Sequence, residues 1–237
     1  MRLKFNPEIM GLLEIVRGEM DAACEPYLVG GAVRDAIIGC EVNDLDFAME
    51  GDPTQLAKRV AKRLQVPFFL LDDERHTARV LYRDQAGQFS PLDFVQFTGN
   101  GLNDDLYNRD FTINAIALSV RDLSQIIDPL NGQSDLEAGL LRPCTALALL
   151  DDPVRVLRGI RVALQFDLVY SPDLPSLMRA ASRQLPETSN ERQRDEFFKI
   201  LEGPEPAQRN IVVTDDRNIP RNHPSTVFDC FHRSSGH

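Results

Sequence analysis

A change of pattern near residue 140 divides the chain into two parts. Before it, short apolar runs alternate with amphipathic segments, as expected for the strands and helices of a mixed sheet. After it, apolar residues recur at helical spacing, and Asp152-Pro153 is a good helix start. We therefore predict an α+β domain over residues 1–140, an all-helical region over 141–202, and an irregular tail over 203–237 whose composition also suits disorder.

The individual elements follow from the same patterns. The predicted strands are residues 27–29, 42–49, 68–71, 77–82, 89–95 and 124–127. The predicted helices are residues 1–22, 32–38, 53–64, 111–118, 153–166, 174–185 and 190–201. Asp110 is expected to cap the helix over 111–118.

Composition excludes several classes of protein. With 43% hydrophobic and 26% charged residues, the 237-residue chain is typical of a globular protein and not of a disordered or fibrous one. No apolar run approaches the roughly 20 residues of a membrane span. Neither a secretion signal nor closely spaced cysteines occur, which favours a cytoplasmic protein with reduced thiols and no membrane partner. The net charge of −10 disfavours general binding of nucleic acids, so any polyanion must be held by local clusters of arginines.

A pair of glycines stands between the first apolar strand and the helix that follows. Gly30 and Gly31 would let the backbone approach a ligand closely, and the free N–H groups of the next helix favour phosphate. Arg34, one turn into that helix, could add a bidentate contact. Taken alone, a tight strand-to-helix turn is the simpler interpretation.

Asp44 and Asp46 alternate with apolar residues in the strand predicted over 42–49. Alternation places both carboxylates on one face, where they repel each other unless a cation lies between them. Mg²⁺ suits such a site because it shares its shell with phosphate oxygens. A lone pair of this kind is more simply a solvated acidic edge. Together with the glycine turn, however, it predicts a nucleotidyl-transfer site, to which Asp93 could add a third catalytic carboxylate.

Arginines mark two further segments. Arg109, just ahead of a predicted helix, is well placed for a phosphate or a ribose. Arg155, Arg158 and Arg161 recur every third residue on a helix flank that they share with Asp152. A solvated, ion-paired face is the simpler alternative, but an aspartate and an arginine one turn apart could also read the edge of a base. The charged segment 191–196 is interpreted as an ion-paired surface.

Six segments in this order resemble the class II tRNA nucleotidyltransferases (CCA-adding enzymes) and the similar bacterial poly(A) polymerases. They are LVGGAVRD (28–35), NDLDFAM (43–49), NRDFTINAIA (108–117), IIDPLNGQSDL (126–136), DDPVRVLRGIRVA (151–163) and ERQRDEFFKIL (191–201). The resemblance implies a nucleotidyltransferase head like that of the DNA polymerase beta superfamily, followed by a helical neck.

The resemblance also implies an activity and a set of site residues. The expected reaction is Mg²⁺-dependent addition of C, A or both from CTP and ATP to the 3′ end of tRNA, with release of pyrophosphate. Asp44 and Asp46 match the metal ligands, and Asp152 with Arg155 matches the pair that reads the base. The other expected nucleotide contacts are Gly30, Gly31, Arg34, Arg109, Arg158 and Arg161.

Several alternatives remain open. A poly(A) polymerase, or a partial enzyme that adds only CC or only A, would carry the same motifs. The sequence departs from the family at Asp151, where glutamate is usual, and at Asn108, where many members have a second arginine. The resemblance ends near Gly203, whereas family members continue into domains that hold the tRNA. A truncated nucleotide-binding fragment with weak RNA binding is therefore a further alternative.

Overall fold

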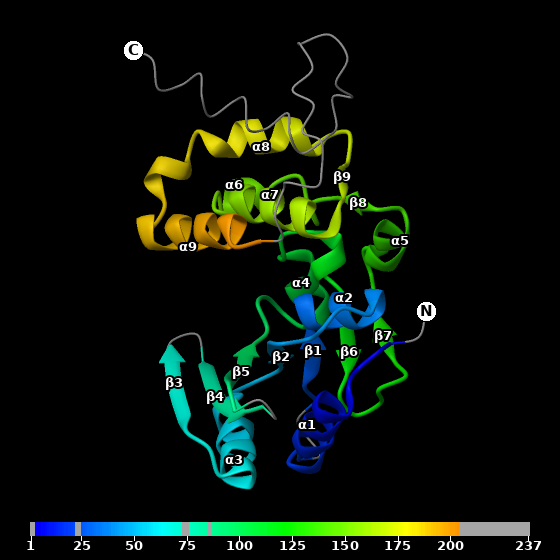
Figure 1. The fold of residues 1–237 in the computed structure, drawn as a ribbon, viewed down its shortest axis with the longest axis vertical. Coiled ribbons are helices and arrows are strands. Elements are labelled where there is room, and N and C mark those ends of the chain that lie inside the picture. The colour runs from blue at the N-terminus through cyan, green and yellow to red at the C-terminus, as the bar shows by residue number, and fades with distance from the viewer. Residues whose placement is uncertain (1–2, 22–24, 73–75, 85–86, 204–237) are drawn as a thin grey trace. The chain divides into compact units, whose positions relative to one another are not determined.

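The computed structural model describes residues 3–21, 25–72, 76–84 and 87–203 (Figure 1). It divides into two units. The first unit contains residues 1–109 and 113–133, and the second contains Asp110–Thr112 and the chain from Ser134 onward. Of the tail predicted over 203–237, residues 204–237 lie outside the part of the chain that the structure describes.

The first unit is built on a seven-stranded sheet with the order β3-β4-β5-β2-β1-β6-β7. The strands are β1 (Tyr27–Val29), β2 (Leu45–Met49), β3 (Phe68–Asp72), β4 (Thr77–Arg83), β5 (Phe89–Gln96), β6 (Ala117–Ser119) and β7 (Ile126–Ile127). β2 and β5 pair in parallel, whereas all the other neighbours in this sheet are antiparallel. The α+β class predicted from the sequence is confirmed.

Helices of the first unit begin at clear local signals. They are α1 (Pro7–Gly18), α2 (Gly31–Ile38), α3 (Thr54–Leu64) and α4 (Leu102–Tyr107), while η1 (Thr112–Asn114) and α5 (Gly132–Glu137) span the changes between units. The Asn6 side chain caps α1 by accepting from the amide of Ile9 at 2.8 Å. The Asp52 carboxylate accepts from the amide of Thr54 at the start of α3, also at 2.8 Å.

Alternation along β2, β4 and β5 gives the sheet two different faces. One face is apolar and fully or almost fully buried; it carries Leu45, Phe47, Ala78, Val80, Tyr82, Leu92 and Phe94. The rings of Phe47 and Phe94 stack on this face with their centroids 5.0 Å apart. Helix α3 packs against β3 and β4 on the same side, where Lys58 lies over the ring of Phe68. The opposite side, with Asp46, Arg79 and Asp93, is here called the polar face.

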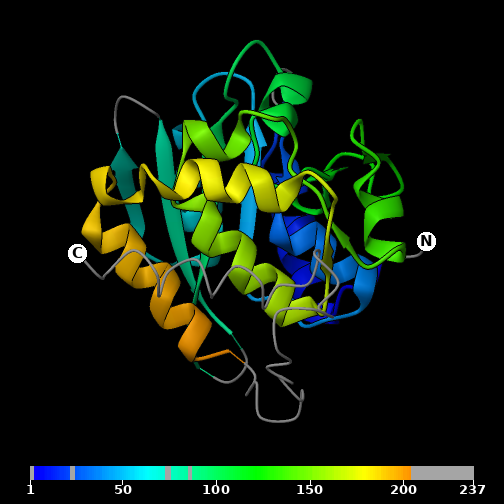
Figure 2. The ribbon, with the colours of Figure 1, turned by 90° about the horizontal axis from the view of Figure 1, so that it is seen from above.

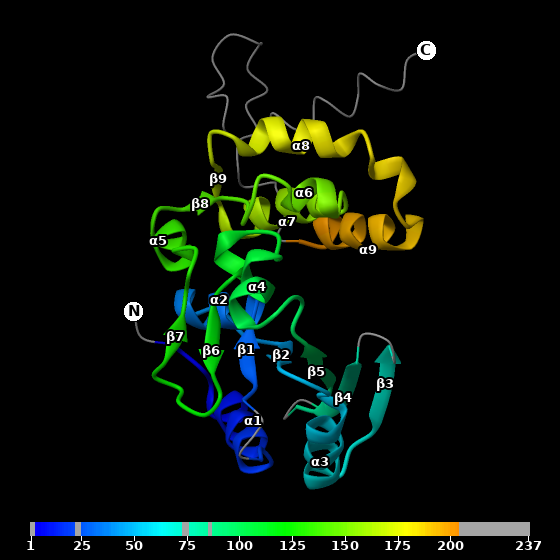
Figure 3. The ribbon, with the colours of Figure 1, turned by 180° about the vertical axis from the view of Figure 1, so that it is seen from behind.

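The second unit is mainly helical (Figures 2 and 3). Its helices are α6 (Ala148–Asp151), α7 (Arg155–Phe166), α8 (Leu174–Ser182), η2 (Leu185–Glu187) and α9 (Asn190–Leu201). Helix α7 packs against α6, α8 and α9. A short parallel pair, β8 (Leu140–Leu141) with β9 (Val169–Tyr170), is an addition to the predicted helical pattern.

Two predicted elements of the first part were wrong. No long helix covers 111–118: these residues form η1 and β6, because every side chain from 111 to 120 is buried and such a run suits a central strand as well as a helix. Asp110 instead accepts from the adjacent amide of Phe111 at 2.7 Å. The strand predicted over 42–49 begins only at Leu45, so that Asp44 precedes it. Helix α4 was not predicted.

Two helical glycines make a matched stability test. A Cβ on Gly159 in α7 would lie 2.8 Å from Cζ of the fully buried Phe111, whereas a Cβ on Gly11 in α1 would meet nothing within 4 Å. We expect Gly159→Ala to lower the free energy of unfolding by about 1–3 kcal/mol through overpacking. Gly11→Ala should raise it by up to about 1 kcal/mol through helix propensity. Urea unfolding of both variants measures the difference, and equal effects would contradict the packing described here.

Candidate active site

A row of charged residues crosses three neighbouring strands in register. Asp46 on β2 stands opposite Asp93 on β5, and Asp93 stands opposite Arg79 on β4. Directly paired residues project from the same face of a sheet, on strands about 4.8 Å apart. The polar face therefore brings together two predicted carboxylates and one arginine that sequence reasoning missed.

Arg79 neutralises the third predicted carboxylate. Its Nε and Nη2 donate to the two oxygens of Asp93 at 2.7 and 2.6 Å, a bidentate ion pair. These hydrogen bonds raise the pKa of Arg79. A signal for this contact does exist in the sequence, since Arg79 interrupts an apolar strand between Ala78 and Val80 in the same way that Asp93 interrupts the next strand.

Asp46 is a half-buried carboxylate among other carboxylates. Desolvation, the largest cause, and the charges of Asp93 and Asp44 together raise its pKa to about 6, against the opposing charges of Arg109 and Arg79. A divalent cation would relieve such a cost, so the donor set fits Mg²⁺. Within the described ranges, no three Asp, Glu, His or Cys side chains are grouped closely enough to hold a metal ion. The arrangement is thus a pair of aspartates, Asp44 and Asp46, beside a third aspartate, Asp93, that is paired with an arginine.

The glycine turn lies against Asp46. Gly30 has φ 74° and ψ −139°, a conformation that favours glycine. A Cβ at this position would lie 3.1 Å from Nη1 of Arg109 and 3.8 Å from Oδ2 of Asp46. The guanidinium of Arg109 is oriented by Asp105, which accepts from Nη2 at 2.8 Å. Three predicted site residues, Gly30, Asp46 and Arg109, therefore converge.

Arg34 is held beside the same turn by protein partners. Its side chain is almost fully buried; Nη1 donates to Oδ1 of Asn114 at 2.5 Å and Nε to Oδ1 of Asp35 at 2.9 Å. A Cβ on Gly31 would lie 3.2 Å from Nη2 of Arg34. The guanidinium is thus fixed close to the turn, with Asn114 as its positioning partner.

The second unit holds the remaining predicted residues. Oδ2 of Asp152, between α6 and α7, accepts from Nη2 of Arg192 at 2.6 Å and lies 3.8 Å from Nε of Arg155. Nη1 of Arg155 also donates to the carbonyl oxygen of Ala148 at 3.0 Å. Asp152 and Arg155 therefore form the neighbouring pair that the one-turn spacing predicts.

Arg158 and Arg161 share a buried glutamate. Glu196 on α9 is 5% exposed and accepts from Nε of Arg161 at 2.8 Å and from Nε of Arg158 at 3.2 Å. Arg158 also reaches Asp110, at 3.4 Å. Burial alone would raise the pKa of Glu196, but the hydrogen bonds and charges of both arginines outweigh it and lower that pKa. The interpretation of 191–196 as a surface was wrong for Glu196.

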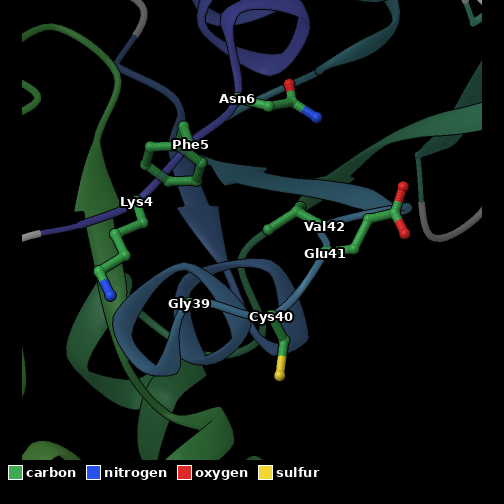
Figure 4. Close-up of a pocket in the computed structure, with 7 residues that line it drawn as sticks. All are labelled: Lys4, Phe5, Asn6, Gly39, Cys40, Glu41 and Val42. Carbon is green, nitrogen blue, oxygen red and sulfur yellow. The ribbon is translucent and has the colours of Figure 1, made fainter.

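A separate pocket of about 300 Å³ lies in the first unit (Figure 4). The segment before α1 and the segment after α2 line it, with Lys4, Phe5, Asn6, Gly39, Cys40, Glu41 and Val42. None of the predicted site residues is among them. Cys40 and Cys144 are free thiols, and the other two cysteines lie outside the described residues. Over those same described ranges, no helix combines the length and the hydropathy of a membrane span.

Several known proteins are similar to this chain in sequence and in fold. Residues 26–142 match the poly A polymerase head domain family. A CC-adding tRNA nucleotidyltransferase of Synechocystis is 38% identical over 191 residues, which cover 80% of this chain and 44% of that protein. An A-adding tRNA nucleotidyltransferase of Deinococcus radiodurans is also 38% identical over 191 residues, which cover 78% of this chain and 42% of that protein.

The structural comparison agrees. The Thermotoga maritima CCA-adding enzyme, solved in complex with tRNA-CCA, has a TM-score of 0.76 at 31% identity. The match covers 86% of this chain and 49% of the Thermotoga chain. The chain thus spans less than half the length of each of these three proteins. It carries a poly(A) polymerase head domain, and most of its length is similar to tRNA nucleotidyltransferases.

Proposed function

We propose that this chain is the nucleotidyl-transferring part of an enzyme that adds C, A or both from CTP and ATP to the 3′ end of tRNA. The observation that carries the proposal is the half-buried Asp46, set between Asp93 and the turn at Gly30 with Arg109 beside it. Relatives named CC-adding and A-adding enzymes, and solved neighbours with tRNA, CTP or ATP, support it. A cytoplasmic location goes with this proposal.

The chemistry follows from the residues of the site. The RNA 3′ hydroxyl oxygen attacks the α-phosphorus and releases its proton to solvent, the bond from this phosphorus to the bridging oxygen breaks, and pyrophosphate leaves. Asp44 and Asp46 would hold Mg²⁺, which supplies a more acidic hydroxyl and charge stabilisation when bound. Arg109 and the N-terminus of α2 at Gly31 would bind the phosphates. By holding Asp93, Arg79 limits the negative charge that the triphosphate meets.

Each of the two regions predicted from the sequence has its own part in the proposal. The head, residues 1–140, supplies the phosphate and metal contacts. The neck, residues 141–202, supplies base recognition by Asp152 and Arg155, with Arg158 and Arg161 as further nucleotide contacts. Since Glu196 holds the last two, we assign them the additional task of fixing α7 to α9.

The test is extension of two tRNAs, one that ends at its discriminator base and one that ends in CC. The chain is incubated with CTP alone, ATP alone and both, and the products are separated by size. Addition of C with CTP, of A with ATP, or of CCA with both supports the proposal. No extension with any triphosphate, at RNA concentrations that saturate binding, contradicts it.

A poly(A) polymerase is the second candidate, favoured by the family that residues 26–142 match. It would extend the RNA with many A residues and ignore CTP. A nucleotide-binding fragment would instead show intact CTP or ATP affinity with RNA binding that is weak at every salt concentration.

Asp152→Ala tests base recognition. Loss of its carboxylate should reduce the preference for CTP and ATP over GTP and UTP about tenfold, since a bidentate base contact is worth roughly 1–3 kcal/mol. The ratio of kcat/KM values for the four triphosphates measures this. Asp151→Ala, which removes an adjacent exposed carboxylate, is the control and should leave the ratio unchanged. An unaltered ratio in Asp152→Ala would argue against base reading.

A further inference from the structure

The row of charged residues continues to the edge of the sheet with an aromatic ring. Phe69 on β3 stands opposite Arg79 on β4, which places it on the polar face with Asp93 and Asp46. Its side chain is 44% exposed, although burial of a phenylalanine would be favourable. β3 is the outermost strand on this side of the sheet. An exposed ring thus lies in register with the candidate catalytic carboxylates.

A second exposed ring lies on the same face. Phe89 at the start of β5 stands opposite Arg83 at the end of β4, and the guanidinium of Arg83 lies 4.5 Å from the ring centroid. Phe89 is 55% exposed. Arg79 and Arg83 are four residues apart on one strand, so alternation puts both on the polar face. Two aromatic rings and two arginines therefore occupy the polar side of β3, β4 and β5.

This combination suits single-stranded nucleic acid. Exposed aromatic rings stack bases, and neighbouring arginines attract the backbone phosphates. Three strand spacings separate Phe69 from Asp46, about 14 Å in all. Since stacked nucleotides lie about 3.4 Å apart, that span corresponds to roughly four nucleotides. A base on Phe69 would therefore belong to the RNA just behind the reacting 3′ end.

A protein partner would also cover exposed phenylalanines, but the place of the rings favours RNA. The chain has a net charge of −10, yet on this surface Arg79 pairs with the nearest acid, Asp93, and Arg83 lies over the ring of Phe89. The surface is also continuous with the row that ends at Asp46, where the RNA end must react. We propose that Phe69 and Phe89 stack bases of the single-stranded 3′ end of the acceptor RNA, an inference that rests on the proposed function.

The test uses a short RNA hairpin with a single-stranded 3′ end that carries 2-aminopurine, whose fluorescence falls when it stacks. The full chain and its variants Phe69→Ala and Phe89→Ala are titrated with this RNA. Leu70→Ala is the matched control, because Leu70 is equally exposed at 47% but stands opposite Ala78 and so belongs to the other face. Phe69→Tyr, which keeps an aromatic ring, tests rescue.

We expect each phenylalanine-to-alanine variant to raise the Kd for RNA about tenfold and to lose part of the quenching. KM values for CTP and ATP, and kcat at saturating RNA, should stay near wild type. Phe69→Tyr and Leu70→Ala should bind as the wild type does. Quenching is read without catalysis, so it tests the stacking site even in a chain that incorporates no nucleotide.

Two results would overturn the inference. One is unchanged RNA affinity and quenching in both alanine variants. The other is an equal loss in Leu70→Ala, which would indicate a general effect on the edge of the sheet. In the first case, a change in sedimentation of the variants would identify the surface as a protein interface.

Discussion

Asp46→Asn is expected to reduce nucleotide incorporation at least about a thousandfold, equivalent to roughly 4 kcal/mol of transition-state stabilisation. The variant keeps the size of the side chain but removes the charge that would hold Mg²⁺ beside the glycine turn. Single-turnover extension of RNA measures the loss. Binding of CTP, measured at equilibrium, should remain detectable because Arg109 and the turn are intact.

Stability separates this effect from unfolding. Desolvation and the neighbouring carboxylates raise the pKa of Asp46 to about 6, so the charged carboxylate increasingly costs stability as the pH rises from the ordinary aspartate range to above 6. Asp46→Asn should therefore be at least as stable as the wild type at neutral pH without Mg²⁺. Stabilisation by added Mg²⁺ should be lost in the variant. Asp122→Asn, an exposed carboxylate elsewhere in the first unit, is the control. Normal incorporation by Asp46→Asn would refute the metal site.

Glu196→Gln should lower the free energy of unfolding by about 3 kcal/mol. This value is at the lower end of the range for breaking a buried ion pair, because Arg158 and Arg161 are partly exposed. The change removes the charge that both guanidinium groups share and leaves two cations close together. In a chain of this size, the melting temperature should fall by roughly 6–12 °C. Calorimetry measures it, and Glu191→Gln, exposed on the same helix, should change little.

Acid should remove the same stabilisation. The pKa of Glu196 is lowered in the folded chain, so its contribution is present above the ordinary glutamate pKa and is lost as the pH falls through the lowered value. The stability difference between wild type and Glu196→Gln should therefore shrink at low pH. A difference that does not depend on pH would show that packing, and not charge, underlies it.

The parts of the candidate site that are close in sequence are predictable from sequence. Gly30, Arg34 and Asp46 follow one another through a strand, a helix and the next strand, and local patterns are enough to group them. Arg79 and Phe69 were missed because only the pairing of β3, β4 and β5 brings them into the row of Asp46. Registers between strands are set by long-range packing, which a single sequence does not display.

The errors in the fold have a similar cause. The run Phe111–Leu118 contains good helix formers, yet it forms η1 and β6 because its surroundings bury every residue. Glu196 shows the same limit, since its charged neighbours in sequence suggest a surface while Arg158 and Arg161 enclose it. The metal and nucleotide roles of the site residues stay predictions.

The tripeptide Asp110–Thr112 has a consequence for genetic dissection. It interrupts the first unit in sequence, yet Asp110 pairs with Arg158, the Phe111 ring fills the space beside Gly159, and the Thr112 hydroxyl donates to Asp135. A gene fragment that starts at codon 134 would leave these partners without their counterparts. Chimaeras that exchange helical regions between relatives must therefore transfer this insert as well.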